Sequence, residues 1–431
     1  MTFVFLLGAA SAATQIEGGN ISHTWSGWYQ KGCIRDGSSP ARACDHFRRW
    51  REDIDLMAEV GIKVYRLGIE WARLEPARGN YDEAAAASYR ELFTYMKSRG
   101  IAPLLTIHHF TNPLWFEDIG GFATPANIPV FLGFVEYVVK RFGDLVDEYV
   151  TINEPNVFAV MGYFAGEFPP GRRSMRLALR VQSVMASCHI QAYSLIHKLR
   201  REMGCQNTKV GFAHHARVFE PKSKNNLWHR LCARLTSRMF QDALTRACLL
   251  GRFSFPLKKY GRLRGKLRCK LHPGEYADFL GLNYYTRSTV SKLGDGVREG
   301  SPRNDLGWEI YPEGIAICAR ELHDILARPI YITENGTCDN NDAFRCRFIC
   351  EHLKVLAESG LPVERYYHWC FTDNFEWCEG ESARFGLVHI DYASQKRTLK
   401  KSGRFYAAMI KNKGVTDEIY NEFVAPQEYH L

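Results

Sequence analysis

Several features that define special protein classes are missing from this 431-residue chain. No run of about 18 apolar residues is free of charges or helix-breaking clusters, which argues against a membrane-spanning helix. The 13 cysteines are odd in number and scattered, and no Cys-x-x-Cys pair occurs among them, so neither a disulfide framework nor a zinc site is indicated. We therefore expect reduced thiols, a cytoplasmic protein, no membrane partner, and neither a metal nor another cofactor.

The N-terminus lacks the basic segment with which a signal peptide begins. Its first thirteen residues are apolar and end in Ser-Ala-Ala, as a leader would. Without the basic segment, we expect Phe3–Ala10 to be the first strand of the fold rather than part of a cleaved leader.

No linker or low-complexity stretch divides the chain, and hydrophobic residues make up 46% of it, so we expect one domain over residues 1–431. Short β-rich apolar runs alternate with helix-length segments whose apolar residues follow helical spacing. This alternation predicts an α/β fold, a single (β/α)8 TIM barrel. The predicted strands are Phe3–Ala10, Ile62–Ile69, Ala102–His108, Val146–Asn153, Lys209–His214, Asp278–Tyr285, Pro329–Glu334 and Glu364–Phe371. The predicted helices are Asp45–Glu59, Ala84–Arg99, Pro129–Phe142, Arg176–Arg201, Pro312–Leu326 and Asp342–Ser359.

Two further segments interrupt this alternation. We expect an insert around Asn225–Lys270 between the fifth and sixth strands, and a surface loop, rich in glycine and charge, over Arg287–Leu306.

Two of the predicted strands end in a glutamate, Glu154 after the fourth and Glu334 at the end of the seventh. A carboxylate inside the barrel wall would cost several kcal/mol, so both should face the mouth formed by the carboxyl ends of the strands. Two carboxyls facing each other there can hydrolyse a glycosidic bond, one protonating the leaving oxygen while the other attacks the anomeric carbon or activates water. For either glutamate alone, a structural cap or an ion pair is the alternative.

From Phe3 to about Tyr406 the chain resembles the family 1 glycoside hydrolases, which are retaining β-glycosidases. The matching motifs are Gln15-Ile16-Glu17-Gly18-Gly19, Cys44-Asp45-His46, Glu52-Asp53, Tyr65-Arg66, Ile69-Glu70-Trp71-Ala72-Arg73-Leu74, His108-His109-Phe110, Thr151-Ile152-Asn153-Glu154-Pro155, Asn283-Tyr284-Tyr285-Thr286, Ile332-Thr333-Glu334-Asn335-Gly336, Asp373-Asn374-Phe375-Glu376-Trp377 and Phe385-Gly386-Leu387.

The resemblance implies a role for each matching residue. Glu154 would be the acid/base and Glu334 the nucleophile, and Asn153 would bind the 2-hydroxyl of the sugar. Tyr285 and Arg66 would hydrogen-bond the nucleophile and keep it ionised. The residues that would bind the sugar, besides Asn153 and Tyr285, are Gln15, His109, Trp369, Glu376, Trp377 and Phe385.

The chain departs from the family pattern near the predicted mouth. Thr111-Asn112-Pro113 stands where relatives commonly have Asp-Leu-Pro, and Phe122 stands where Trp is usual. Relatives that act on 6-phosphorylated sugars usually have a small residue at the position of Glu376, because a carboxylate repels the phosphate. The resemblance therefore implies hydrolysis of unphosphorylated β-glucosides, with β-galactosides and β-fucosides left open. A 6-phospho-β-glycosidase and a transglycosylase are the alternatives within the enzyme class.

The net charge of +9 comes from one segment. Between Arg217 and Lys270, fifteen lysines and arginines face only Glu220 and Asp242, while the rest of the chain is slightly acidic. We interpret the segment as an exposed helical face with solubilising charge; an anionic surface or an acidic aglycone as its partner is the alternative. No RNA-binding motif accompanies it, so we expect no nucleic-acid partner. A non-catalytic sugar-binding or anionic-surface-binding barrel is the competing class, and the oligomeric state stays open.

Overall fold

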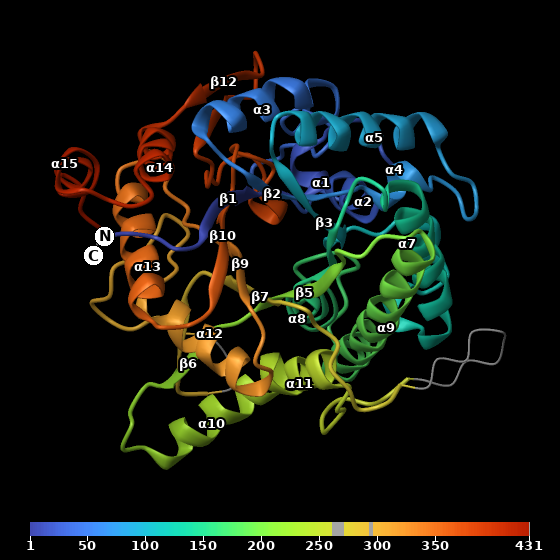
Figure 1. Cartoon of the computed structure of the whole chain (residues 1–431). Coiled ribbons are helices and arrows are strands. Elements are labelled where there is room, and N and C mark those ends of the chain that lie inside the picture. The colour runs from blue at the N-terminus through green and yellow to red at the C-terminus, as the bar shows by residue number, and fades with distance from the viewer. Residues whose placement is uncertain (261–270, 293–295, 431) are drawn as a thin grey trace.

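The computed structural model describes residues 1–260, 271–292 and 296–430. At its centre, parallel strands close into a barrel in the order β1-β10-β9-β7-β5-β4-β3-β2, surrounded by helices (Figure 1). The predicted (β/α)8 barrel and its eight strands are confirmed, with ends that differ by a few residues. The barrel strands are β1 (Leu6–Ala10), β2 (Val64–Gly68), β3 (Ala102–His108), β4 (Glu148–Asn153), β5 (Lys209–His215), β7 (Leu280–Tyr284), β9 (Ile330–Asn335) and β10 (Val363–Trp369).

The six predicted helices are present, and others accompany them. Among the described residues, no helix is both long and apolar enough to cross a membrane. The main helices are α3 (His46–Val60), α5 (Glu83–Ser98), α7 (Ile128–Phe142), α9 (Met175–Glu202), α12 (Glu313–Ile325), α13 (Arg345–Glu358) and α14 (Lys401–Asn412), the last of which the periodicity did not predict. Shorter ones are α1 (Ala13–Ile16), α2 (Thr24–Gln30), α4 (Trp71–Leu74), α6 (Leu114–Asp118), α8 (Pro155–Val160) and α15 (Asp417–Ile419).

The barrel strands read as near-continuous apolar runs because helices cover them outside and side chains fill the barrel inside. β4 and β9 are buried along their whole length. β1 lies between β10 and β2, with Ala10 in register with both Trp369 and Arg66. The apolar run near the N-terminus is therefore a barrel strand, as predicted.

The insert after the fifth strand contains β6 (Val218–Pro221), α10 (Leu227–Ser237), a π-helical turn (Arg238–Asp242) and α11 (Ala243–Leu250). Residues 261–270, the last part of the basic segment, lie outside the described residues. α10 exposes its arginines, which agrees with the predicted charged helical face. Arg217 departs from that expectation, because it lies in the wall of a cavity rather than on the outer face.

The expectation of a surface loop over Arg287–Leu306 is wrong at its beginning. Arg287–Val290 forms β8, which pairs with β6 in a small parallel sheet. Arg287 is buried, and its Nε donates to Glu309 at 2.9 Å. The charged composition indicated a solvated loop. In the structure, Glu309 pairs with the Arg287 side chain and β6 pairs with the backbone of β8, and the local sequence reveals neither partner.

Candidate active site

A cavity of about 580 Å³ opens at the carboxyl ends of the barrel strands. Residues from segments far apart in the sequence converge on it, because every strand of a parallel barrel ends at the same mouth. Those predicted from the sequence that line it are His109, Glu154, Tyr285, Glu334, Trp369, Glu376, Trp377 and Phe385.

Glu334, near the end of β9, accepts hydrogen bonds from two donors. Arg66 Nη1 lies 2.5 Å from its Oε1, and the Tyr285 hydroxyl lies 2.6 Å from its Oε2. Arg66 projects from β2 and is completely buried. Since a guanidinium only donates, this pairing favours the ionised form of Glu334.

Glu154 directly follows β4 and adopts a left-handed backbone conformation, with φ at +41°. Such a φ is uncommon for a residue with a side chain and costs about 1–3 kcal/mol, so the surroundings must hold it in place. Its Oε1 accepts from Asn283 Nδ2 at 2.8 Å and lies 3.1 Å from His215 Nδ1.

An amide and guanidinium network links the two carboxyls across the barrel. Asn153 Oδ1 accepts from Arg66 Nη2 at 2.6 Å and from Asn283 Nδ2 at 3.0 Å. Arg66 therefore contacts both Glu334 and Asn153, while Asn283 contacts both Asn153 and Glu154. With its oxygen occupied, Asn153 donates through Nδ2 to His109 Nε2 at 2.9 Å. The network fixes the two glutamates relative to one another.

Burial raises the pKa of both Glu154 and Glu334, because each carboxyl loses its contact with water. The nearby Arg66 cation opposes this rise at both residues, and the charge of Glu154 adds to it at Glu334. Of the two carboxyls, Arg66 hydrogen-bonds Glu334 and not Glu154. When the two glutamates share one proton, this geometry favours the proton on Glu154.

A third carboxyl, Glu376, also lines the cavity. Gln15 Nε2 donates to Glu376 Oε2 at 3.0 Å and to Asn374 Oδ1 at 3.1 Å. Burial, followed by the charge of Glu334, raises the pKa of Glu376 to about 8. Gln15 Oε1 and His109 Nδ1 are buried and have no hydrogen-bond partner within the described part of the chain. Orphaned polar atoms of this kind are positions that a hydroxylated ligand can satisfy.

Aromatic rings form one wall of the site. The ring of His109 lies 5.8 Å from those of both Trp369 and Trp377, and Trp377 in turn packs against Trp25 at 4.7 Å. Phe385 lines the same cavity. Such rings offer an apolar platform to the C–H face of a pyranose, while the neighbouring amides and carboxyls can bind its hydroxyls.

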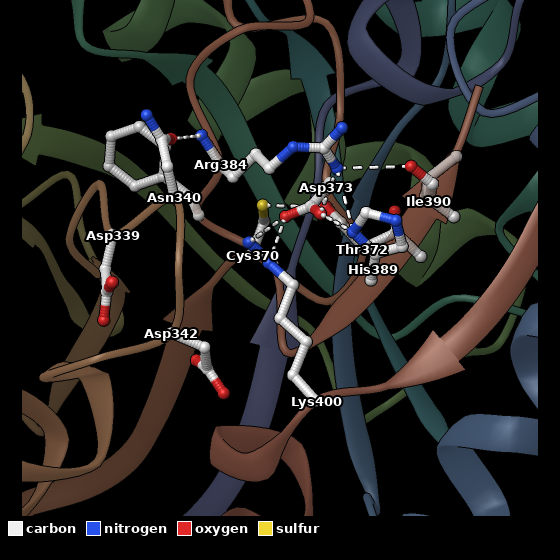
Figure 2. A network of polar contacts seen from close by, with 12 residues as sticks. Asp339, Asn340, Asp342, Cys370, Thr372, Asp373, Arg384, His389, Ile390 and Lys400 are labelled. Atoms are coloured by element: carbon white, nitrogen blue, oxygen red, sulfur yellow. Dashed lines mark hydrogen bonds and ion pairs between the residues drawn. The ribbon is translucent and has the colours of Figure 1, made fainter.

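The loop that carries Glu376 and Trp377 is anchored by Asp373. Lys400 Nζ donates to Asp373 Oδ1 at 2.6 Å, and Arg384 Nη1 donates to its Oδ2 at 2.8 Å; Figure 2 shows both cations converging on this carboxylate. Although burial alone would oppose ionisation, Lys400 and hydrogen bonding hold the pKa of Asp373 well below its usual range. The loop is thus fixed by a buried ion-pair cluster.

Several residues of the site were absent from the predicted set. Asn283 belongs to a motif noted in the sequence but was given no role, although it contacts Glu154 directly. The predicted fifth strand stops one residue before His215, so the rule that strand ends face the mouth would have found it with a correct boundary. Arg217, Arg287 and Trp308 carry no such signal, since they follow or lie between the barrel strands.

No group of three or more His, Cys, Asp or Glu side chains could hold a metal ion in the part of the chain that the structure describes. The cysteines described there are free thiols, and most are buried.

Comparisons with known proteins show the family to which the chain belongs. The model of "Glycosyl hydrolase family 1" matches residues 2–415. Beta-glucosidase A of Thermotoga maritima is 30% identical, over 96% of this chain and 98% of that protein. A beta-glucosidase of an Agrobacterium species is 31% identical, over 94% of each chain. The solved beta-glycosidase from Pyrococcus horikoshii superposes with a TM-score of 0.86 and 33% identity, covering 99% of this chain and 98% of that one. With the barrel and the paired strand-end glutamates in place, this match over nearly the full length shows that the chain belongs to glycosyl hydrolase family 1 and is a glycoside hydrolase.

Proposed function

We propose that the chain hydrolyses unphosphorylated β-glucosides with retention of configuration, and that it accepts β-galactosides and β-fucosides as well. The observation that carries this proposal is the pair of buried carboxyls, Glu154 and Glu334, at two strand ends of one barrel and linked through Arg66, Asn153 and Asn283. Glycosidases that retain configuration use such a pair as acid/base and nucleophile.

In the first step Glu334 attacks the anomeric carbon, and the glycosidic oxygen leaves with a proton from Glu154. The assignment follows from the donors, because Arg66 and Tyr285 both stabilise an ionised Glu334. Burial raises the pKa of Glu154, which favours a carboxyl that still holds its proton when substrate binds. The products of this step are the free aglycone and a glycosyl ester on Glu334.

In the second step Glu154, now ionised, removes a proton from water as the water attacks the anomeric carbon. The ester bond to Glu334 breaks, and the sugar leaves with its original configuration. Asn153 is positioned for the sugar 2-hydroxyl, since it lies between the two carboxyls and its amide is held on both sides. Transfer to an alcohol instead of water uses the same intermediate, so transglycosylation is the side reaction of this scheme.

The remaining predicted residues are assigned to the sugar. The free acceptor of Gln15 and the free ring nitrogen of His109 are available to its hydroxyls, and Glu376 lies beside Gln15. Trp369, Trp377 and Phe385 supply the apolar wall. An unphosphorylated sugar fits this set, because Glu154, Glu334 and Glu376 lie together in the cavity wall and a phosphate would add further negative charge.

We further propose that residues 1–431 act as one catalytic domain and that the protein works in the cytoplasm. The continuous barrel supports the first statement. The free cysteines within the described residues support the second, because oxidising compartments favour paired cysteines.

Azide rescue tests the two assignments against each other. Glu334→Ala should lose turnover, and azide should restore it by attacking the face that the nucleophile has vacated, which gives an α-glycosyl azide. Glu154→Ala should instead give a β-glycosyl azide, since azide then attacks the glycosyl ester in place of water. Product anomers are read by NMR. The proposal fails if the two variants give the same anomer or if both retain normal turnover.

A further inference from the structure

A histidine and an arginine lie behind Glu154 and have no part in the scheme above. His215 is the last residue of β5 and is buried, with Nδ1 3.1 Å from Glu154 Oε1. Arg217 follows two residues later, and its Nε lies 2.8 Å from His215 Nε2. Glu154, the imidazole and the guanidinium therefore form a linear chain that leads away from the reacting carboxyl.

The hydrogens along this chain are determined by chemistry. The Nε of an arginine always carries a hydrogen and cannot accept, so His215 Nε2 must be the acceptor of that contact. A neutral imidazole carries only one hydrogen, which must then sit on Nδ1 and point at Glu154 Oε1. Arg217 thus fixes His215 as a neutral donor toward the carboxyl.

The pair is itself held firmly by the insert. The Gln241 side chain accepts from the Arg217 backbone N–H at 3.0 Å, and its amide donates to the Arg217 carbonyl at 3.1 Å. Phe240 packs edge-on against the His215 ring at 5.8 Å, and Tyr285 stacks on that ring at 5.9 Å. Both Phe240 and Gln241 belong to the π-helical turn before α11. The insert therefore shapes the wall behind Glu154.

The hydrogen bonds from Asn283 and His215 also distinguish the two oxygens of Glu154. Oε1 faces two donors, Asn283 Nδ2 at 2.8 Å and His215 Nδ1 at 3.1 Å. An oxygen that accepts from two N–H groups has no room for a proton of its own, so the catalytic proton must sit on Oε2. Orienting the carboxyl in this way aims the proton at the leaving oxygen.

We propose that His215 is a positioning residue for the acid/base Glu154, and that Arg217 acts through it by fixing its tautomer. The inference rests on the proposed role of Glu154. A protonated imidazole in the same place would put a cation beside the carboxyl and favour loss of the proton that the first step needs. Within residues 1–260, 271–292 and 296–430, the ionisable groups seen against this ring include Glu154, Arg217 and Tyr285.

The test compares two aryl β-glucosides that differ in their need for an acid. Phenyl β-glucoside releases a poor leaving group that requires a proton, whereas 2,4-dinitrophenyl β-glucoside releases a stable anion that does not. We expect His215→Leu to lower kcat/KM on the phenyl substrate by about tenfold or more, and on the dinitrophenyl substrate by less than about threefold. His215→Asn should recover most of the loss, because its Nδ2 can donate from nearly the position of the imidazole Nδ1.

Arg217→Met should show the same substrate dependence and change the histidine itself. Nitrogen-15 NMR of histidine-labelled protein, with the His215 signal assigned by its absence from His215→Asn, should show a hydrogen on Nδ1 in the wild type. In Arg217→Met the hydrogen should move to Nε2 or the ring should become doubly protonated. This readout keeps the proposal testable if His215→Leu does not fold.

Two controls separate the possible failures. Arg230→Leu, an exposed change on α10, should behave as the wild type on both substrates. Glu154→Gln should show the strongest dependence on the leaving group. If Glu154→Gln shows none, the role proposed for Glu154 is wrong and this inference falls with it. Suppose that Glu154→Gln behaves as expected but folded His215 and Arg217 variants lose kcat/KM equally on both substrates. Only the positioning role is then overturned. The same holds if the hydrogen of His215 in the wild type sits on Nε2.

Discussion

At the scale of single residues, the chemistry of this site follows from the burial of several carboxyls in one small pocket. Glu154 and Glu334 are buried and Glu376 is half-buried, and loss of contact with water raises the pKa of each. Of these three carboxyls, only Glu334 pairs with an arginine or lysine in the described part of the chain, namely with Arg66. The carboxyls therefore differ in proton affinity because of their partners, although all three are glutamates.

The rate should depend on pH with a bell-shaped profile. At low pH, protonation of the nucleophile Glu334 stops the attack; at high pH, Glu154 loses the proton that the leaving group needs. Since burial raises the pKa of Glu154, the basic limb should lie well above the value of about 4.3 that is usual for glutamate. Measuring kcat/KM on phenyl β-glucoside between about pH 4 and pH 9 checks this.

Glu154→Gln supplies the matched comparison for that profile. It should remove the basic limb, because glutamine has no proton to lose in this range, whereas Glu358→Gln, an exposed change on α13, should leave both limbs in place. A flat profile in the wild type would contradict the assignment.

Glu376 should determine discrimination against phosphorylated sugars. A 6-phosphate carries about −1.5 to −2 charges at neutral pH, and it would meet the carboxyls of Glu154, Glu334 and Glu376 in the cavity wall. We expect kcat/KM on 4-nitrophenyl 6-phospho-β-glucoside to be at least about a hundredfold below that on the unphosphorylated compound.

Replacement of Glu376 by serine should narrow the difference in kcat/KM between the two substrates, because it removes the carboxyl proposed to repel the phosphate. Glu379→Ser is the matched control: it lies in the same loop and lines the cavity, but is paired with Arg35. Equal kcat/KM values for the two substrates in the wild type would contradict the predicted discrimination against phosphorylated sugars.

At the scale of elements, the site depends on loops that rigid strands and ion pairs hold in place. The glycine of the Glu334-Asn335-Gly336 motif shows how closely β9 and β10 approach at the mouth. A Cβ at Gly336 would lie 1.9 Å from the carbonyl oxygen of Trp369, so only glycine fits there. The segment that carries Glu334 can therefore pack directly against the segment that carries the Trp369 platform.

The loop after β10 should lose its anchor in Asp373→Asn. The change leaves the Lys400 ammonium buried without its counter-charge, so the free energy of unfolding near about pH 7 should fall by about 3–5 kcal/mol. Because the folded-state pKa of Asp373 is depressed, its stabilising contribution is present above the unfolded pKa of about 3.9 and is lost as the pH falls.

Urea unfolding near about pH 7 and about pH 2 measures this effect, because the contribution is lost as the pH falls from the unfolded pKa through the folded one. The difference between the wild type and Asp373→Asn should shrink at the lower pH. Asp391→Asn, at an exposed carboxyl on β11 (Val388–Asp391), which pairs with β12 (Lys396–Leu399), should change stability far less. A difference that stays constant with pH would exclude an ionised Asp373 as the source of the stability.

At the scale of the whole molecule, the most strongly charged segment is the basic insert after β5. Arg230 and Arg234 of α10 are exposed, whereas Phe240 and Gln241 of the following π-helical turn contact His215 and Arg217. Interactions between exposed charges are screened beyond about 8 Å at physiological salt. The exposed charge of the insert should therefore have little effect on catalysis.

Reversal of four exposed basic residues, Lys222, Lys224, Arg230 and Arg234, to glutamate should leave kcat/KM on a neutral β-glucoside unchanged within about threefold. The same variant should elute earlier from heparin, since retention follows the exposed charge. Arg217→Glu is the contrasting variant, because it changes the residue that contacts His215, and it should lose activity. A large loss in the fourfold variant would show that the outer charge takes part in function.

The amino-acid sequence by itself determined the alternation of strands and helices and the placement of Glu154 and Glu334 at strand ends. Both are local properties: apolar periodicity within 5 to 15 residues specifies each element, and a carboxylate that ends a buried strand must face the mouth. The motifs also directed attention to Trp369 and Glu376, which line the cavity, and to Gln15, which hydrogen-bonds Glu376. The end of β5 was one residue too short in the prediction, since periodicity defines element boundaries poorly.

Only the tertiary structure decided which of these residues touch. Asn283 reaches Glu154 across 129 positions of sequence and His215 reaches it across 61. Arg287 was assigned to a solvated loop because its partner Glu309 lies beyond a stretch that reads as polar. Such contacts depend on the stagger of neighbouring strands and on the path of the insert around the mouth, which no local pattern encodes. The arrangement that fixes the proton on one oxygen of Glu154 is therefore a property of the closed barrel, whereas the presence of the two glutamates is a property of the sequence.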